Sequence, residues 1–213
     1  MNIAKYIDHT LLKATTTEMQ IKTLCQEAKD YNFKAVCVNG CWVPLVSQLL
    51  KDSQVLVATV VGFPLGAMCT EAKVNEAKDA INNGADEIDM VLNVGWLKSQ
   101  HFDNAQYDIT QVKNAIGDNL LKVILETCYL TDDEKRKACG LAIAAGADYV
   151  KTSTGFGTGG ATLQDVKLIK EAIGDKALIK ASGGIGDRET ALQYIEQGVS
   201  RIGTSSGIKL VTE

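Results

Sequence analysis

Short apolar runs rich in β-branched residues alternate with helical patterns along the chain, and this alternation constrains the fold most strongly. The unit recurs about every thirty residues, within the range of structural repeats. The strand-like runs cover residues 5–8, 34–38, 55–61, 87–92, 121–126, 148–152, 177–181 and 201–203. The clearest helical stretches between them cover residues 17–30, 71–82, 103–116, 132–145, 162–173 and 188–196. Because each helix connects two strands as a crossover, the sequence predicts a parallel sheet.

Eight strands are the number that closes a parallel sheet into a barrel. We therefore predict an α/β protein, a single (β/α)8 TIM barrel, and the 213 residues lie near the lower end of the length of such barrels. No Pro/Ser-rich linker or shift of composition divides the chain, so one catalytic domain over residues 1–213 is expected. A doubly wound open sheet is the structural alternative.

The expected helices carry terminal signals. TTTE at residues 15–18 and TDDE at residues 131–134 both fit a capping box. NNGADEID and AAGADYVK place a glycine where a helix ends and the next strand begins. These signals support the alternation of helices and strands.

Charge and cysteine content restrict the partners and the compartment. The formal net charge is −4 without a cluster of lysines or arginines, so neither nucleic acid nor an anionic membrane is expected as a partner. The N-terminal MNIAKYIDHTLLK lacks an apolar signal segment, and no run reaches transmembrane length, which favours a cytoplasmic protein. The six cysteines include no CxxC pair, so reduced thiols are expected. A homodimer or a higher homo-oligomer remains open.

Lys151 is the residue that most directly indicates chemistry. Active sites of (β/α)8 barrels lie at the C-terminal ends of the strands, and Lys151 comes at the end of such a strand before a Thr/Ser/Gly loop. Burial disfavours the ammonium form and lowers the pKa of such a lysine. Lys180 ends the next strand, about 5 Å away, and its charge disfavours protonation of Lys151 further. The pair predicts an amine nucleophile; two lysines of the barrel rim are the structural alternative.

Carboxylates near other strand ends complete the candidate site. Asp89 can move protons between substrate hydroxyls and water, or can form a structural ion pair with one of the lysines. Lys122 and Glu126 are four residues apart in one expected strand, so both should face the same way. We interpret them as a polar pair of the barrel interior with a structural role.

Three glycine-rich segments follow the late strands, where barrels commonly bind phosphate through backbone N–H groups. They are STGFGTGG at 153–160, SGGIG at 182–186 and IGTSSG at 202–207, the last with hydroxyls from Ser205 and Ser206. Tight turns are the alternative for any one of them, but three together favour an anion site. The GxGxxG spacing in the first also raises a dinucleotide site. That site needs an acidic residue after the next strand, and this chain has Lys180 and Ala181 there.

Metal chemistry is not expected, and neither is a cofactor. His9 and His101 are the two histidines and stand far apart, without the spacing of a zinc site. His9 is expected to orient a neighbouring residue.

The chain resembles the deoxyribose-phosphate aldolase family from Tyr6 to about Gly207, in segments that occur in this order: YIDHTLL, VCVN, VVGFPLGA, GADEIDMVLN, KVILET, GADYVKTSTGF, KASGGI and RIGTSSG. The resemblance implies a class I aldolase on a (β/α)8 barrel, acting on a phosphorylated sugar and aldehydes: it cleaves 2-deoxy-D-ribose 5-phosphate reversibly to acetaldehyde and D-glyceraldehyde 3-phosphate. It implies that Lys151 forms the Schiff base, Lys180 perturbs it and Asp89 relays protons. It also implies a set of substrate-binding residues: Asp8 and Cys37 in the pocket, and Gly155, Gly183, Gly184, Ser205 and Ser206 at the phosphate.

Two positions depart from some members of that family. Those members end in a tyrosine that assists proton transfer, whereas this chain ends Leu210–Val211–Thr212–Glu213. Some carry a lysine where this chain has Phe156. A different Schiff-base aldolase of transaldolase type and a non-catalytic sugar-phosphate-binding barrel are the alternative functions.

Overall fold

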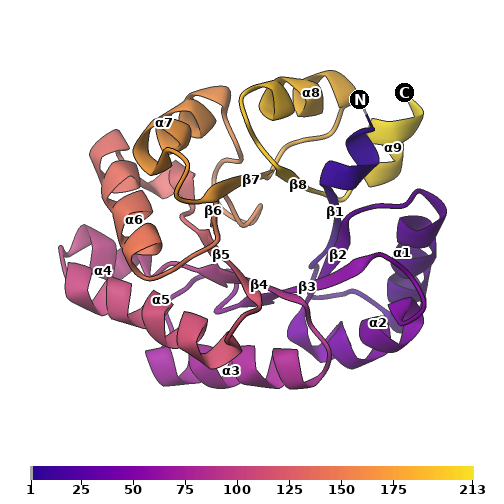
Figure 1. Cartoon of the computed structure of the whole chain (residues 1–213), viewed down its shortest axis with the longest axis horizontal. Coiled ribbons are helices and arrows are strands. Elements are labelled where there is room, and N and C mark those ends of the chain that lie inside the picture. The colour runs from indigo at the N-terminus through magenta and orange to yellow at the C-terminus, as the bar shows by residue number, and fades with distance from the viewer. Residues whose placement is uncertain (1) are drawn as a thin grey trace.

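Eight parallel strands close into a barrel, and the helices form a ring around it (Figure 1). The computed structural model describes residues 2–213. The strands are β1 (Ile7–Leu11), β2 (Ala35–Val38), β3 (Leu56–Val61), β4 (Glu87–Val91), β5 (Leu120–Ile124), β6 (Tyr149–Lys151), β7 (Leu178–Ser182) and β8 (Arg201–Thr204). Each strand pairs with the next, and β8 pairs with β1. The predicted (β/α)8 barrel is confirmed.

The outer ring contains the expected helices and three short additional ones. Its members are α1 (Glu18–Asp30), α2 (Val43–Leu50), α3 (Thr70–Asn82), α4 (Val94–Lys98), α5 (Phe102–Ile116), α6 (Asp132–Ala144), α7 (Leu163–Ile173), α8 (Arg188–Glu196) and α9 (Gly207–Thr212). The sequence analysis did not propose α2, α4 or α9, because helices this short show little periodicity. No helix within residues 2–213 combines the length and the apolar character needed to cross a membrane.

The helix starts show which capping signals the chain uses. Before α6, Thr131 and Glu134 form the predicted capping box. Before α1, the box is formed by Thr17 and Gln20, so the prediction of a box at residues 15–18 was wrong by two positions. Because glutamine at the third helical position can reach back as glutamate does, Gln20 supplied a valid signal that the analysis overlooked.

The first strand begins later than predicted. Residues Ile3–Tyr6 form a 3-10 helix, η1, whose first turn is capped by the side chain of Asn2, so β1 starts at Ile7. The termini lie close together in Figure 1, where η1 packs beside α9. This start places Asp8 in β1, paired in register with Gly203 of β8.

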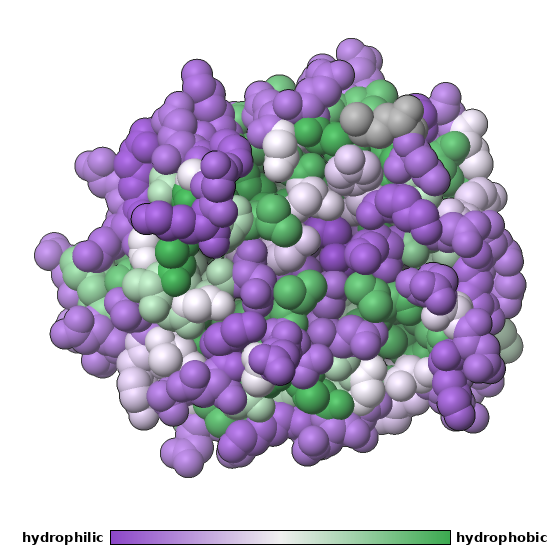
Figure 2. All heavy atoms as spheres, in the orientation of Figure 1, coloured by the Kyte–Doolittle hydropathy of each residue, from purple (hydrophilic) through white to green (hydrophobic). Residues whose placement is uncertain are grey.

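Two apolar clusters pack against the sheet, one on its outer face and one on part of its inner face. The outer faces of the strands pack apolar side chains against the helices, as Val36, Ile88, Val123 and Ile202 do. A second apolar cluster is formed on the inner faces of β2 and β3 by Ala35, Cys37, Ala58 and Val60, together with Leu12, which follows β1. Hydrophilic residues cover most of the face that Figure 2 shows. The other strands carry buried charged side chains on their inner faces, and these side chains form the candidate site.

Candidate active site

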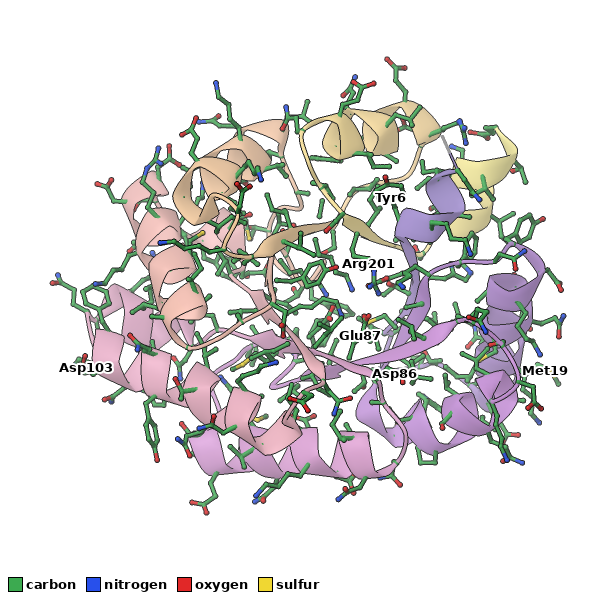
Figure 3. All side chains as sticks on the ribbon, viewed as in Figure 1. Tyr6, Met19, Asp86, Glu87, Asp103 and Arg201 are labelled. Atoms are coloured by element: carbon green, nitrogen blue, oxygen red, sulfur yellow. The ribbon has the colours of Figure 1, made fainter. Side chains whose placement is uncertain are left out.

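Seven charged side chains fill the interior of the barrel beside β4–β8 and β1. Side chains of a strand alternate between its two faces, so residues two apart point the same way. Figure 3 shows Glu87 and Arg201 pointing toward one another inside the ring of strands, whereas Met19 and Asp103 lie on the outer helices. The interior set is buried throughout and consists of Asp8, Glu87, Asp89, Lys122, Lys151, Lys180 and Arg201.

Lys151 is the last residue of β6 and the member of this set that reaches the cavity. It pairs in register with Lys180 of β7, so both side chains leave adjacent strands on the same face. Its Nζ lies 2.7 Å from Oδ2 of Asp89, and 3% of the residue is exposed. Lys151 also lines a cavity of about 520 Å³ at the C-terminal ends of the strands. The amine is therefore buried but open to a small molecule.

Asp89 of β4 is shared between three lysines. Its Oδ2 accepts hydrogen bonds from Lys151 and Lys180, both at 2.7 Å, and its Oδ1 accepts one from Lys122 at 2.9 Å. Burial alone would raise the pKa of Asp89, but the three ammonium groups outweigh burial and hold it well below the usual value. Asp89 is therefore ionised, and its charge is divided between several partners.

The remaining cations have carboxylate partners of their own. Lys180 donates to Asp8 as well as to Asp89. Arg201 donates to Asp8 Oδ1 at 2.7 Å and to both oxygens of Glu87, at 2.9 and 2.7 Å. Burial would lower the pKa of Lys180 and of Arg201, but these carboxylates raise both above their usual values. Burial would raise the pKa of Asp8, yet Lys180 and Arg201 lower it to about 2.

Counting charges identifies the group that can be neutral. Three carboxylates face four cations, so the fully ionised network carries one surplus positive charge. Burial lowers the pKa of Lys151, and Lys180 lowers it further against the opposing pull of Asp89. For Lys122, by contrast, Asp89 and Glu87 outweigh burial and raise the pKa. Loss of one proton from Lys151 therefore balances the network and leaves a free amine.

The predicted pairing of Lys122 with Glu126 was wrong. Lys122 points into the barrel and donates to Glu87 Oε2 at 2.6 Å. The strand β5 ends at Ile124, and Glu126 has left-handed backbone with a φ of 56°, so the two-residue alternation no longer applies to it. The Glu126 carboxylate instead accepts two hydrogen bonds from Thr154, one from its backbone N–H at 3.2 Å and one from the Thr154 hydroxyl. Glu126 thus holds the loop that follows Lys151.

The three glycine-rich segments form one side of the cavity. Gly155, Gly183, Gly184, Ser205 and Ser206 all line it, as predicted from the glycine-rich loops and the resemblance. The backbone N–H groups of the first four donate no hydrogen bond to any residue in 2–213. Unpaired N–H groups that converge on a cavity form a site for an anion.

Close packing of two loops explains a further glycine of that pattern. The N–H of Ala161 donates to the carbonyl of Gly183 at 3.0 Å. A Cβ at Gly160 would lie 2.2 Å from the same carbonyl oxygen, so no larger residue fits there. The last glycine of the GxGxxG spacing is therefore explained by contact between the loops after β6 and β7.

Other residues of the expected site lie at or beyond its edge. Asp8 and Cys37 are fully buried and do not line the cavity; Asp8 acts on the network through Lys180. His9 faces away from the interior, and its Nε2 lies 2.7 Å from Oε2 of Glu27. Phe156 lines the cavity with a half-exposed ring that packs edge-on against Phe63, with 5.3 Å between the centroids.

Sequence reasoning missed Glu87 and Arg201. Glu87 stands two residues before Asp89 in the same strand, so alternation alone could have placed both carboxylates in the interior. Arg201 opens β8 and stands two residues before Gly203. The lack of a side chain at Gly203 leaves room for Lys180, whose Cε would be 3.2 Å from a Cβ there.

The barrel holds a buried lysine that can lose its proton, beside a cavity lined by unpaired backbone N–H groups. This arrangement is typical of an enzyme that attacks a carbonyl compound through a Schiff base. Known proteins agree with this class. A family model described as "DeoC/LacD family aldolase" matches residues 2–210. The chain belongs to the DeoC/LacD aldolase family.

Similar proteins extend over nearly the whole chain. A deoxyribose-phosphate aldolase from Finegoldia magna is 59% identical over 211 residues, which cover 99% of each chain. One from Brevibacillus brevis is 58% identical and covers 100% of this chain and 96% of its own. The crystal structure of a putative deoxyribose-phosphate aldolase from Coccidioides immitis has a TM-score of 0.97 at 45% identity, covering 99% of this chain and 84% of that one. A tetrameric deoxyribose phosphate aldolase from Aeropyrum pernix has a TM-score of 0.89 at 31% identity, covering 98% and 89%.

Proposed function

We propose that the protein reversibly cleaves 2-deoxy-D-ribose 5-phosphate to acetaldehyde and D-glyceraldehyde 3-phosphate through a Schiff base on Lys151. The observation that carries this proposal is the charge count of the interior: Lys151 is the surplus cation, its pKa is lowered, and it faces the cavity. The activity named for the relatives at 58–59% identity supplies the identity of the substrate. The whole chain acts as one catalytic domain.

The first chemical stage is formation of the iminium. Neutral Lys151 attacks the C1 aldehyde of the open-chain sugar, and the resulting carbinolamine loses water. Asp89 lies 2.7 Å from the Lys151 nitrogen, close enough to accept its proton and pass it to water. Because the pKa of Asp89 lies well below its usual value, Asp89 relays protons and does not retain them.

The second stage is cleavage of the C2–C3 bond. The C3 hydroxyl loses its proton, the C3 oxygen becomes an aldehyde oxygen, and the bonding electrons move from C2–C3 into the iminium to give an enamine. D-glyceraldehyde 3-phosphate then leaves. Protonation of the enamine at C2 and hydrolysis release acetaldehyde and restore the amine. The covalent adduct replaces one difficult step by several easier ones.

The cavity orients the sugar relative to the amine. The phosphate binds to the unpaired N–H groups of Gly155, Gly183, Gly184 and Ser205, and Ser206 adds a hydroxyl. The aldehyde end of the sugar then points toward Lys151 in the same cavity. Asp8 acts indirectly by fixing Lys180, and burial raises the pKa of the Cys37 thiol, which keeps it in its neutral form.

Two further features belong to this proposal. All six cysteines are free thiols, which fits the reducing cytoplasm. A homo-oligomer is also proposed, because the relative from Aeropyrum pernix is described as a tetramer.

Borohydride reduction in the presence of acetaldehyde tests the mechanism. The expected product is a single ethyl-lysine at Lys151, found by peptide mapping and absent from Lys151→Met. An adduct on another lysine would overturn the role given to Lys151. Absence of any adduct would favour a non-catalytic sugar-phosphate-binding barrel. Turnover of a ketose donor in place of acetaldehyde would favour an enzyme of transaldolase type.

A further inference from the structure

We propose that Lys13 supplies the positive charge that binds the phosphate group of the substrate. This inference rests on the proposed function, because it assigns a charge to the phosphate end of the same cavity. Lys13 lines that cavity together with Gly183, Gly184, Ser205 and Ser206.

The topology brings Lys13 to the phosphate end. Lys13 follows β1 after one intervening residue, and the two serines follow β8 directly. Because β1 and β8 are parallel neighbours, with His9 in register with Thr204, their C-terminal loops leave the barrel side by side. The backbone around Lys13 is fixed, since Asn39 donates to the carbonyl of Leu12 at 3.2 Å and Thr16 donates to that of Lys13 at 3.0 Å.

Charge also singles out Lys13. The residues that line the cavity include two cations, Lys13 and Lys151, and no carboxylate. Lys151 is bound to Asp89 and forms the Schiff base, so it cannot remain with the phosphate. The exposed side chain of Lys13 forms no ion pair within residues 2–213. It is therefore available to a ligand without breaking an existing contact.

The other walls of the cavity provide no such charge. Phe156 contributes an apolar ring from the loop after β6, and the loops after β7 and β8 contribute glycines, hydroxyls and backbone N–H groups. Neutral donors carry no net charge, so an ammonium group adds a Coulomb attraction to the dianion that the backbone N–H groups and hydroxyls do not supply. A dianionic phosphate in this cavity therefore gains its main electrostatic attraction from Lys13.

Kinetics of Lys13→Gln with two substrates test the assignment. We expect the KM for 2-deoxyribose 5-phosphate to rise about tenfold, equivalent to about 1.4 kcal/mol. The kcat should stay within about twofold, because Lys13 does not contact the reacting carbons. The kcat/KM for unphosphorylated 2-deoxyribose should not change. Lys13→Arg, which keeps the charge, should restore most of the affinity.

Lys5→Gln is the matched control. Lys5 is exposed like Lys13 but lies in η1, before the start of β1 and so at the opposite end of the barrel. This variant should leave the KM for both substrates unchanged. Equal losses of kcat/KM on both substrates in Lys13→Gln would overturn the assignment and indicate a structural role, and so would an unchanged KM for the phosphorylated sugar.

Binding of inorganic phosphate separates this inference from the proposed function. Calorimetry on wild type, Lys13→Gln and Lys5→Gln needs no catalysis. About tenfold weaker binding to Lys13→Gln alone would support the role of Lys13 even if borohydride trapped no adduct. Equal affinity in all three proteins would overturn that role even if Lys151 formed the Schiff base.

Discussion

Replacing Lys180 by leucine tests how the barrel keeps the Lys151 amine neutral. Both lysine nitrogens lie 2.7 Å from the same oxygen of Asp89. That geometry puts them about 4 to 5 Å apart, and two unit charges at this distance repel by about 3 to 4 kcal/mol at an effective dielectric constant of ~20. Since one pKa unit corresponds to about 1.4 kcal/mol, removing the Lys180 charge should raise the pKa of Lys151 by about two to three units.

The direction of the effect is reinforced by Asp89. In the wild type its Oδ2 accepts from both lysines, and in Lys180→Leu the negative charge acts on Lys151 with one competitor fewer. The ammonium form of Lys151 therefore becomes still more favourable. Below the raised pKa, the fraction of free amine falls about tenfold for each pH unit, so activity at pH values below the wild-type pKa of Lys151 should fall by about a hundredfold or more.

The assay is the pH dependence of kcat/KM and of the rate of borohydride trapping. In Lys180→Leu the acidic limb of both profiles should move upward by about two to three pH units. Lys180→Arg keeps a positive charge next to Asp8 and Asp89 and should leave the limb near its wild-type position. A lower rate in Lys180→Leu with an unmoved limb would refute the electrostatic coupling and reduce Lys180 to a packing role.

Two further predictions concern stability. The pKa of Asp8 is lowered from 3.8 to about 2 in the folded protein, so its ion pairs stabilise the fold above pH 4, and this contribution of about 2 kcal/mol should be lost as the pH falls from about 4 to 2. Urea unfolding across that range should show the loss in wild type, and an equally steep loss in Asp8→Asn would contradict it. Lys73 and Asp108 form a fully buried ion pair between α3 and α5, with Lys73 also donating to the Val91 carbonyl at 2.9 Å. Lys73→Met should lower the free energy of unfolding by about 3–5 kcal/mol, because the buried Asp108 carboxylate loses its partner. The double variant Lys73→Met with Asp108→Leu should recover much of that loss. A small loss in the single variant would contradict the prediction and show that Asp108 finds other solvation.

The position of charged residues late in the expected strands indicated the candidate site from the sequence. Lys151 could be recognised because it ends β6 in a barrel whose chemistry lies at strand ends, whereas Lys180, expected at the end of the next strand, is followed by two more residues of β7. The partners of Asp89 could not be deduced in this way, since its contact with Lys122 depends on the register of β4 against β5. Glu126 was misassigned because the chain leaves the strand after Ile124, and no residue type in KVILET signals that change.

The loops that line the cavity also could be predicted only in part from the sequence. Glycine content indicated the loops that line the cavity, because close backbone approach and left-handed backbone both favour glycine. Lys13 carried no local signal, since its position at the cavity follows from closure of the barrel between β8 and β1. Features set by one strand are thus predictable, and features set by the meeting of two strands need the structure.

A lysine nucleophile must be held in position and must also be able to lose its proton, and the sharing of Asp89 meets both requirements. A buried lysine without a carboxylate would lose its proton readily, but nothing would hold its nitrogen in place. A lysine with a carboxylate of its own would be fixed in position, but it would also be held as the unreactive ammonium ion, as the raised pKa of Lys180 shows. Asp89 divides its charge between Lys122, Lys151 and Lys180, and Lys122 and Lys180 have second partners in Glu87 and Asp8. Lys151 therefore receives a hydrogen bond acceptor that fixes its position without enough negative charge to keep its proton.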